Sequence, residues 1–221
     1  MFKKLCIPLA LATLLGYSAV VQPPITEAHV VGMNQTDGNM KLEYPLVYVT
    51  NQAAQERMNT VIAKYVVAMR NLYYNEQMRD VVMTYKVTYE DEDVVSIIIN
   101  SGWYSGQGAH GYNQSQGLVF NKHTGDLIPA TYYVHIKDNE QLRNLISTAQ
   151  VKVYSSTMEE VPIKNLFGLS DLEVRNTNYV LLGDGCIAML YQPYELTAYA
   201  YGVARVVLTR ESIDNLNQMN P

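Results

Sequence analysis

Cysteine is nearly absent from this chain, which has only Cys6 and Cys186 among its 221 residues. Cys6 lies in an apolar N-terminal segment, and a chain without that segment keeps one cysteine and forms no internal disulfide. Small exported domains usually depend on disulfides, whereas a domain of about 190 residues buries roughly 70 % of its unfolded surface and does not need them. We therefore expect a fold stabilised by its hydrophobic core, with Cys186 as a small buried hydrophobic residue.

Basic residues are in the minority, with 16 Lys and Arg against 21 Asp and Glu. Residues 1–28 contain Lys3, Lys4 and Glu27, so the rest of the chain has 14 basic and 20 acidic residues and a formal charge of −6. Nucleic-acid binding generally requires a basic face, and this balance argues against it. A negatively charged domain is better matched to a cationic partner, because opposite charges accelerate encounter.

Motifs for catalysis and metal binding are missing as well. The histidines are His29, His110, His123 and His135. They show neither an HExxH spacing nor the paired ligands of a zinc site, and no G-x-S-x-G motif is present. The acidic run 90–93 is interpreted as a solvated hairpin tip. We expect no metal, no cofactor and no enzymatic activity; the alternative is an unrecognised hydrolase that uses Ser105 and His110.

Long apolar runs are confined to the N-terminus. Lys3 and Lys4 precede an apolar stretch, residues 5–21, which is followed by two prolines and by the small residues around Ala28. This order predicts a signal peptide over residues 1–28 and an exported protein, periplasmic or secreted. The stretch is also at the lower limit for a membrane span, so an uncleaved N-terminal membrane anchor remains the alternative.

Hydrophobic periodicity predicts strands alternating with two main helices and a short C-terminal helix. Strands are expected at residues 29–35, 40–49, 81–89, 94–104, 112–121, 178–182, 186–191 and 201–208. Helices are expected to begin after Thr50 or Asn51, after Asp138 and after Thr209. The pattern indicates an α+β fold with a largely antiparallel sheet. We expect two halves, residues 29–112 and 113–221, packed as one unit.

Two aromatic segments hold the candidate site residues. They are Trp103, Tyr104, Gly106, Gly108, His110 and Gly111 in a glycine-rich loop, and Tyr191, Tyr194 and Tyr199 in a tyrosine-rich connection. Such residues form either a binding surface or a packed plug at the end of a sheet, and the plug is favoured because buried aromatic side chains mostly pack. We predict that the two segments pack together at one end of a common sheet, with His110 buried and hydrogen-bonded between them.

Three segments, in order, resemble motifs of one bacterial family. Tyr104–Gly111 (Tyr-Ser-Gly-Gln-Gly-Ala-His-Gly) resembles its tyrosine-glycine-glycine-alanine-histidine loop, Leu118–Gly125 the strand and turn that follow, and Tyr191–Gly202 its tyrosine-rich signature. The family is the paired extracytoplasmic domain of unknown function of RsiV-type anti-sigma factors and PdaC-type peptidoglycan deacetylases. Where relatives have adjacent glycines, this chain has Gly106-Gln107-Gly108.

The resemblance implies binding rather than catalysis. In the anti-sigma relatives this domain senses lysozyme, and in the deacetylases it accompanies a separate catalytic domain that we do not find here. We expect a non-enzymatic, exported module of the cell envelope that binds a cationic protein such as lysozyme or a cell-wall glycan. No lysozyme-contacting residue carries over to this chain. A structural interaction protein of the envelope is a further alternative.

Overall fold

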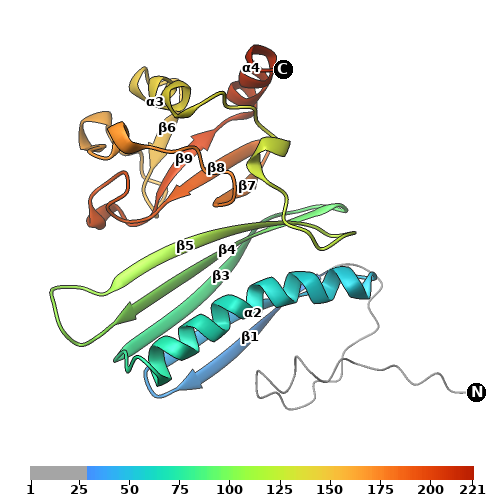
Figure 1. Cartoon of the computed structure of the whole chain (residues 1–221), viewed down its shortest axis with the longest axis vertical. Coiled ribbons are helices and arrows are strands. Elements are labelled where there is room, and N and C mark those ends of the chain that lie inside the picture. Colours follow the sequence, from blue (N-terminus) through green and yellow to red (C-terminus); the bar gives the residue numbers. More distant parts are fainter. Residues whose placement is uncertain (1–28) are drawn as a thin grey trace, which may run out of the picture.

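The computed structural model describes residues 29–221 and arranges them as two stacked sheets with helices on their outer faces (Figure 1). The predicted signal peptide, residues 1–28, lies outside the described residues and stays a prediction. Within the described part, no helix is long and apolar enough to cross a membrane. The α+β class with mostly antiparallel strands is confirmed.

The first sheet has five strands in sequential order. They are β1 (His29–Asp37), β2 (Met40–Tyr48), β3 (Asp80–Glu90), β4 (Val94–Tyr104) and β5 (Tyr112–Asn121). The turn between β1 and β2 contains Gly38 at φ 54°, as the hairpin pattern requires. All neighbours pair antiparallel except β2 and β3, which are parallel because helix α2 (Gln52–Tyr74) carries the chain back between them.

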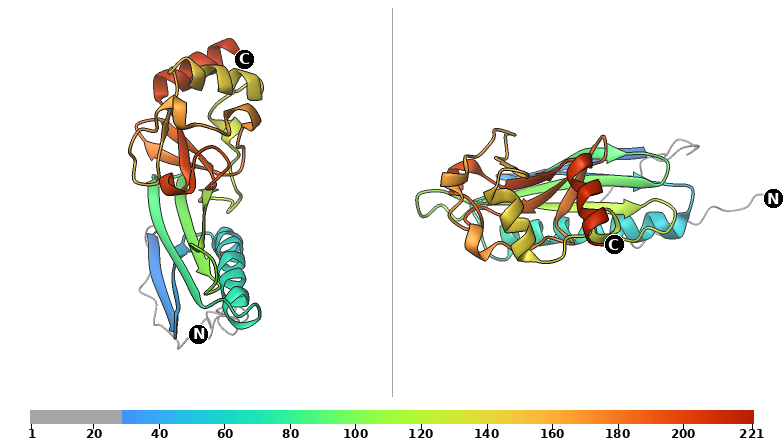
Figure 2. Two further views of the ribbon diagram at one scale, coloured as in Figure 1. Left: turned by 90° about the vertical axis from the view of Figure 1, so that its left-hand side faces the viewer. Right: turned by 90° about the horizontal axis from the view of Figure 1, so that it is seen from above.

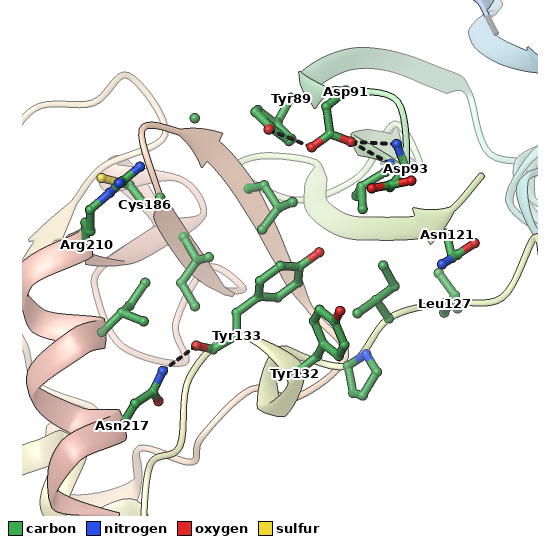
Figure 3. Close-up of a pocket in the computed structure, with 18 of the residues that line it drawn as sticks. Tyr89, Asp91, Asp93, Asn121, Leu127, Tyr132, Tyr133, Cys186, Arg210 and Asn217 are labelled. Carbon is green, nitrogen blue, oxygen red and sulfur yellow. Dashed lines mark hydrogen bonds between the residues drawn. The ribbon is translucent and has the colours of Figure 1, made fainter. Parts of the chain in front are cut away.

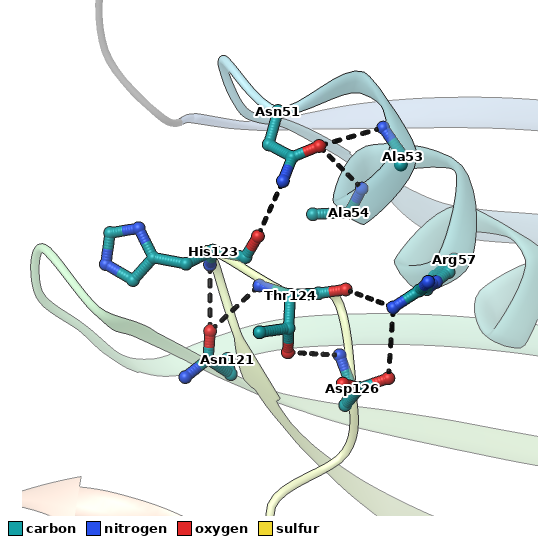
Figure 4. Close-up of polar contacts among 8 residues, drawn as sticks. All are labelled: Asn51, Ala53, Ala54, Arg57, Asn121, His123, Thr124 and Asp126. Atoms are coloured by element: carbon teal, nitrogen blue, oxygen red, sulfur yellow. Dashed lines mark hydrogen bonds and ion pairs between the residues drawn. The ribbon is translucent and has the colours of Figure 1, made fainter.

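Helix α2 lies on one face of this sheet and buries Met58, Ile62, Val66 and Met69 against it. Asn51 caps the helix by accepting hydrogen bonds from the first backbone amides, and its side-chain amide donates to the His123 carbonyl oxygen at 2.8 Å (Figure 4). The cap therefore also ties the helix to the turn that follows β5.

Contacts of Arg57, shown in Figure 4, and a close approach of Gly125 join the first two turns of α2 to residues 121–126. Arg57 donates to the Thr124 carbonyl oxygen at 3.1 Å and lies 3.5 Å from the Asp126 carboxylate. Gly125, at φ 77°, passes so close to the Ala54 backbone that any Cβ there would collide with it. The end of β5 is thus fixed to the helix.

The second sheet has four antiparallel strands in the order β6-β9-β8-β7. They are β6 (Lys152–Tyr154), β7 (Tyr179–Gly183), β8 (Cys186–Tyr191) and β9 (Ala204–Leu208). Helices α3 (Asn139–Ser147) and α4 (Arg210–Met219) cover its outer face (Figure 2). Asp138 and Thr209 cap these helices as predicted, each accepting a hydrogen bond from a backbone amide of the first turn.

The two sheets are joined where β7 lies across β3, β4 and β5. At Gly117 the backbones are so close that a Cβ would collide with the Tyr179 carbonyl group. The hydroxyl of buried Ser96 accepts a hydrogen bond from the Leu181 amide at 2.9 Å, and Ile98 packs against the inner face of the second sheet. The two sheets therefore pack directly against each other.

The expectation of one sheet is corrected to two, because β5 ends the first sheet and pairs only with β4. The chain leaves the first sheet after Asn121, where β5 ends. The last strand begins at Ala204 instead of Tyr201, since residues Tyr199–Tyr201 form a 3₁₀ turn, η4.

Candidate functional site

The loop between β4 and β5 depends on its glycines. Gly106 and Gly108 have φ angles of 88° and 90°, which side chains rarely adopt. The Tyr104 hydroxyl donates to the Gly108 carbonyl oxygen at 3.1 Å and closes the loop on itself. A Cβ at Gly111 would lie 2.6 Å from the Trp103 carbonyl oxygen, so the returning chain also needs glycine there. These contacts fix the position of His110.

The connection between β8 and β9 is a tight turn around Tyr194. The Tyr194 amide donates to the Thr197 carbonyl oxygen at 3.0 Å, and the Glu195 carboxylate accepts from the Gln192 amide at 2.7 Å and pairs with Arg175 at 3.0 Å. Tyr194 has a φ of 71° and a side chain that leaves the residue 57 % exposed. A bulky residue in this conformation is strained, whereas glycine would not be.

The loop and the connection meet in an aromatic junction formed by His110, Tyr194 and Tyr199. The His110 ring stacks on Tyr199 with 3.9 Å between centroids, and its Nε2 lies 3.2 Å from the Tyr194 hydroxyl. Its Nδ1 lies 2.8 Å from the Gly111 carbonyl oxygen, which can only accept, so Nδ1 carries the proton. In neutral His110, Nε2 therefore accepts from Tyr194.

Further hydrogen bonds join the junction to the start of β5. The Tyr199 hydroxyl donates to the Gly111 carbonyl oxygen at 2.8 Å and accepts from the Asn113 side chain at 2.7 Å. Gln192 forms a two-way bridge with the backbone of Ser115: its Oε1 accepts from the amide at 2.9 Å, and its Nε2 donates to the carbonyl oxygen at 2.8 Å. The junction therefore links β5 of the first sheet to the end of β8 in the second.

The predicted contact between the two segments is present, but two parts of the prediction are wrong. The segments belong to different sheets rather than to one, and His110 is exposed rather than buried. No atom lies within 4 Å of where a Cβ at Gly108 would be, so the loop stands clear of the fold and leaves the histidine ring open to solvent.

The structure assigns other sequence candidates to packing. Trp103 is partly buried against the core under α2 and stacks on Tyr112 at 5.8 Å, away from the junction contacts. Tyr191 is 1 % exposed, donates to the Glu173 carbonyl oxygen at 2.7 Å and lies 5.1 Å below the Arg175 guanidinium. Burial raises the pKa of its phenol well above the ordinary range.

Ser105 is not paired with His110. Its hydroxyl donates to the Gln107 carbonyl oxygen and accepts from the Gln107 amide, both at 3.3 Å. In residues 29–221, no three or more His, Cys, Asp or Glu side chains are grouped to hold a metal ion. The junction offers two exposed rings, His110 and Tyr194, beside the half-buried Tyr199, and the hydrogen bonds above fix their positions, which suits binding.

A second feature, not predicted from the sequence, is a cleft of about 890 Å³ at the opposite end of β4 and β5. We call it the acidic cleft (Figure 3). It is lined by the β3–β4 turn, residues 121–133, the β7–β8 turn and one side of α4. Cys186 lines this cleft and is half-buried, so the expectation of a fully buried thiol is corrected.

The acidic turn of the cleft is well ordered by its own hydrogen bonds. Asp91 accepts from the Tyr89 hydroxyl at 2.7 Å and from the amides of Asp93 and Val94 at 2.9 and 2.7 Å. Partial burial alone would raise the pKa of Asp91, but these hydrogen bonds and the charge of Lys122 together hold it below its ordinary value. Asp91 is therefore an anion at neutral pH.

Tyr132 and Tyr133 form the wall that faces this turn, with rings 5.1 Å apart and edge to face. Burial raises the pKa of the Tyr133 phenol to about 12, and its hydroxyl oxygen is buried without a hydrogen-bond partner. The adjacent tyrosines after Pro129, together with the acidic run 90–93, were the only sequence signals. Nothing in the sequence indicated that the two segments meet.

No family model matches the chain, and no curated protein matches it. Solved structures do match. A DUF3298 family member from Bacteroides fragilis aligns at a TM-score of 0.55 and 14 % identity, over 86 % of this chain and 92 % of its own. A DUF3298 protein from Pseudomonas aeruginosa PAO1 aligns at 0.53 and 11 %, over 88 % and 94 %. The chain thus shares its fold with members of a family of unknown function.

Proposed function

We propose that the protein is a non-enzymatic binding module of the cell envelope, exported to the periplasm or outside the cell, that binds a wall glycan at the aromatic junction. The observation that carries the proposal is Tyr194. Its backbone is held at φ 71° while its ring stays 57 % exposed. Backbone strain of this kind persists where a side chain is needed in one place, and it concentrates at binding sites.

The chemistry of the junction suits a sugar. Aromatic rings offer flat apolar faces to the C–H groups of a pyranose, and hydroxyl groups at the ring edge supply directed hydrogen bonds. Tyr194 and Tyr199 provide both, and the Gly111 contacts fix their spacing. The rings are ordered before a ligand arrives, which lowers the entropy cost of binding.

Catalysis by the glycine-rich loop has less support. Both nitrogens of His110 are already engaged, and Ser105 bonds within its own turn. The resemblance to the extracytoplasmic domain of RsiV and PdaC relatives supports a binding role at the envelope. Lysozyme, as a cationic protein, is the second candidate ligand, because residues 29–221 carry a formal charge of −6.

The test is co-sedimentation of the protein with purified peptidoglycan sacculi, comparing wild type, Tyr194→Gly and Tyr132→Ala. Glycine relieves the strained φ, so Tyr194→Gly should melt at or above the wild-type temperature while losing most of the bound fraction, about tenfold in affinity. Tyr132→Ala removes a residue from the acidic cleft that is more exposed than Tyr194, 74 % against 57 %, and should bind like wild type.

Full binding by Tyr194→Gly would contradict the glycan proposal at this site. A calorimetric titration with lysozyme provides the other arm. Saturable binding that weakens with salt, without binding to sacculi, would transfer the proposal from glycan to the cationic protein.

A further inference from the structure

The acidic cleft has an excess of negative charge. Four acidic residues and one basic residue line it: Asp91, Asp93, Asp126 and Asp214, and Arg210. Arg57 lies 3.5 Å from Asp126 and balances its charge. Lys122 pairs with Glu90 at 3.0 Å, and its charge also acts on Asp91, so it offsets one of these two carboxylates. His123 lies 2.7 Å from Asp93 and balances it only when protonated. Low-dielectric walls around charges of one sign concentrate the potential, so the cleft attracts cations.

The wall opposite the acidic turn is aromatic. Tyr132 is 74 % exposed, and the hydroxyl groups of Tyr132 and Tyr133 point toward the side of the cleft where Asp91 and Asp93 lie (Figure 3). Leu127, 48 % exposed, extends the apolar part of this wall. An aromatic face opposite carboxylates is the arrangement that favours a cation, which gains from both the ring quadrupoles and the charges.

The Tyr133 hydroxyl adds an observation that is independent of the charges. Its oxygen is buried without a hydrogen-bond partner, which costs free energy unless a group that enters the cleft satisfies it. The phenol stays protonated at neutral pH, because burial raises its pKa to about 12. As a neutral phenol it can accept a hydrogen bond from an ammonium group or donate one to a carboxylate.

From the cleft, its aromatic wall and its carboxylates, we propose that it binds a small organic cation bearing a primary ammonium group, held between Tyr132 and Tyr133 on one side and Asp91 and Asp93 on the other. A volume of about 890 Å³ admits an amino sugar or a lysine side chain with its neighbours. This site is separate from the aromatic junction, since Val94 and Asn121 at the cleft are at the opposite ends of β4 and β5 from the glycine-rich loop.

The proposal is tested with two matched probe pairs and the full-length protein, by following backbone amide shifts in an NMR titration. Glucosamine is compared with N-acetylglucosamine, and lysine amide with Nε-acetyl-lysine amide. The lysine probes are both acetylated at the α-nitrogen, so that in each pair the acetylation compared removes the only positive charge and keeps most of the shape. We expect shifts in residues 89–94, 121–133 and 183–187 with the charged member only, and the stronger pair identifies the source of the amine.

Two charge variants with opposite expected signs sharpen the test. Asp93→Asn should weaken binding of the charged probe about threefold to tenfold, and Arg210→Gln should strengthen it by a similar factor. Both side chains are at the surface of the cleft, and Asp93 is 73 % exposed, so neither change threatens folding. Tyr132→Ala should weaken binding, and Tyr194→Gly should leave it unchanged.

Equal shifts from the charged and acetylated probes would overturn the proposal, because the cleft would then recognise shape rather than charge. Absence of shifts in the cleft at millimolar probe would overturn it as well. Loss of sacculus binding by Tyr194→Gly bears only on the aromatic junction, so the two proposals fail independently.

Discussion

The aromatic junction and the acidic cleft lie at opposite ends of the same two strands, β4 and β5. At the first end, two loops of different sheets hold aromatic rings in place by direct hydrogen bonds between them. At the second, an acidic turn and a tyrosine pair face each other across open space (Figure 3). In the junction the polar groups hydrogen-bond to one another, whereas in the cleft the Tyr133 hydroxyl oxygen is buried without a hydrogen-bond partner.

Both ends depend on how closely the two sheets approach, and the largest expected effect comes from breaking that approach. A Cβ at Gly117 would collide with the carbonyl group of Tyr179, which is backbone and cannot move aside cheaply. Gly117→Ala should therefore lower the free energy of unfolding by about 3 kcal/mol or more and impair binding at both sites. Chemical denaturation measures the first effect.

Gly108→Ala is the matched control for this prediction. Gly108 has a positive φ but no atom near its missing Cβ, so alanine there should cost only about 1 kcal/mol of conformational strain. If the two alanine variants unfold at the same denaturant concentration, the close approach of the sheets contributes nothing beyond backbone strain. The close approach of the two sheets would then not be what stabilises the two ends of β4 and β5.

The local structure was readable from the sequence because it depends on neighbouring residues. Asp138 and Thr209 cap their helices as expected, and of the two caps expected for the first helix, Thr50 and Asn51, the structure uses Asn51. A cap needs only a side-chain oxygen two or three residues before an amide. The alternation from Val81 to Tyr89 likewise identifies a strand with one buried face. The junction was found for the same reason: its aromatic residues are concentrated in two short segments.

Long-range arrangement was not readable. Periodicity cannot say that β2 pairs with β3 in parallel or that the chain changes sheet after Asn121, because both depend on which strands meet. The cleft was missed because its lining comes from separate segments, each of which looks like an ordinary turn. The exposure of His110 was misjudged because glycines that stand clear of the fold and glycines that allow close packing look the same in sequence.

The exposure of His110 leads to a smaller prediction. A buried histidine with both nitrogens bonded would cost roughly 1–3 kcal/mol on truncation, whereas water can replace the partners of an exposed one. His110→Ala should therefore lower stability by less than about 1 kcal/mol, and the change in melting temperature should resemble that of His123→Ala, another exposed histidine with one side-chain partner. A loss of several degrees beyond the control would show that the junction is packed more tightly than its exposure indicates.

The smallest effect concerns the acidic turn and separates the order of the cleft from that of the junction. Asp91 has a pKa below its ordinary value of 3.8 in the folded protein: burial acts in the opposite sense but is outweighed by hydrogen bonds from Tyr89, Val94 and Asp93. A depressed folded pKa means that the stabilisation is complete above about pH 4 and is lost as the pH falls through the folded value.

Asp91→Asn lacks this contribution, so its difference from wild type in free energy of unfolding should be largest near neutral pH and shrink toward pH 2. Tyr89→Phe, which removes one of the hydrogen bonds to the carboxylate, should reproduce part of that pH dependence. Because the Asp91 side chain is near solvent, screening keeps the effect small, and it has to be measured as a difference between variants in urea titrations at a series of pH values. Parallel curves for wild type and Asp91→Asn down to pH 2 would show that the turn is not held by its carboxylate, and the cleft would then lose its preformed anion while the junction kept its ordered rings.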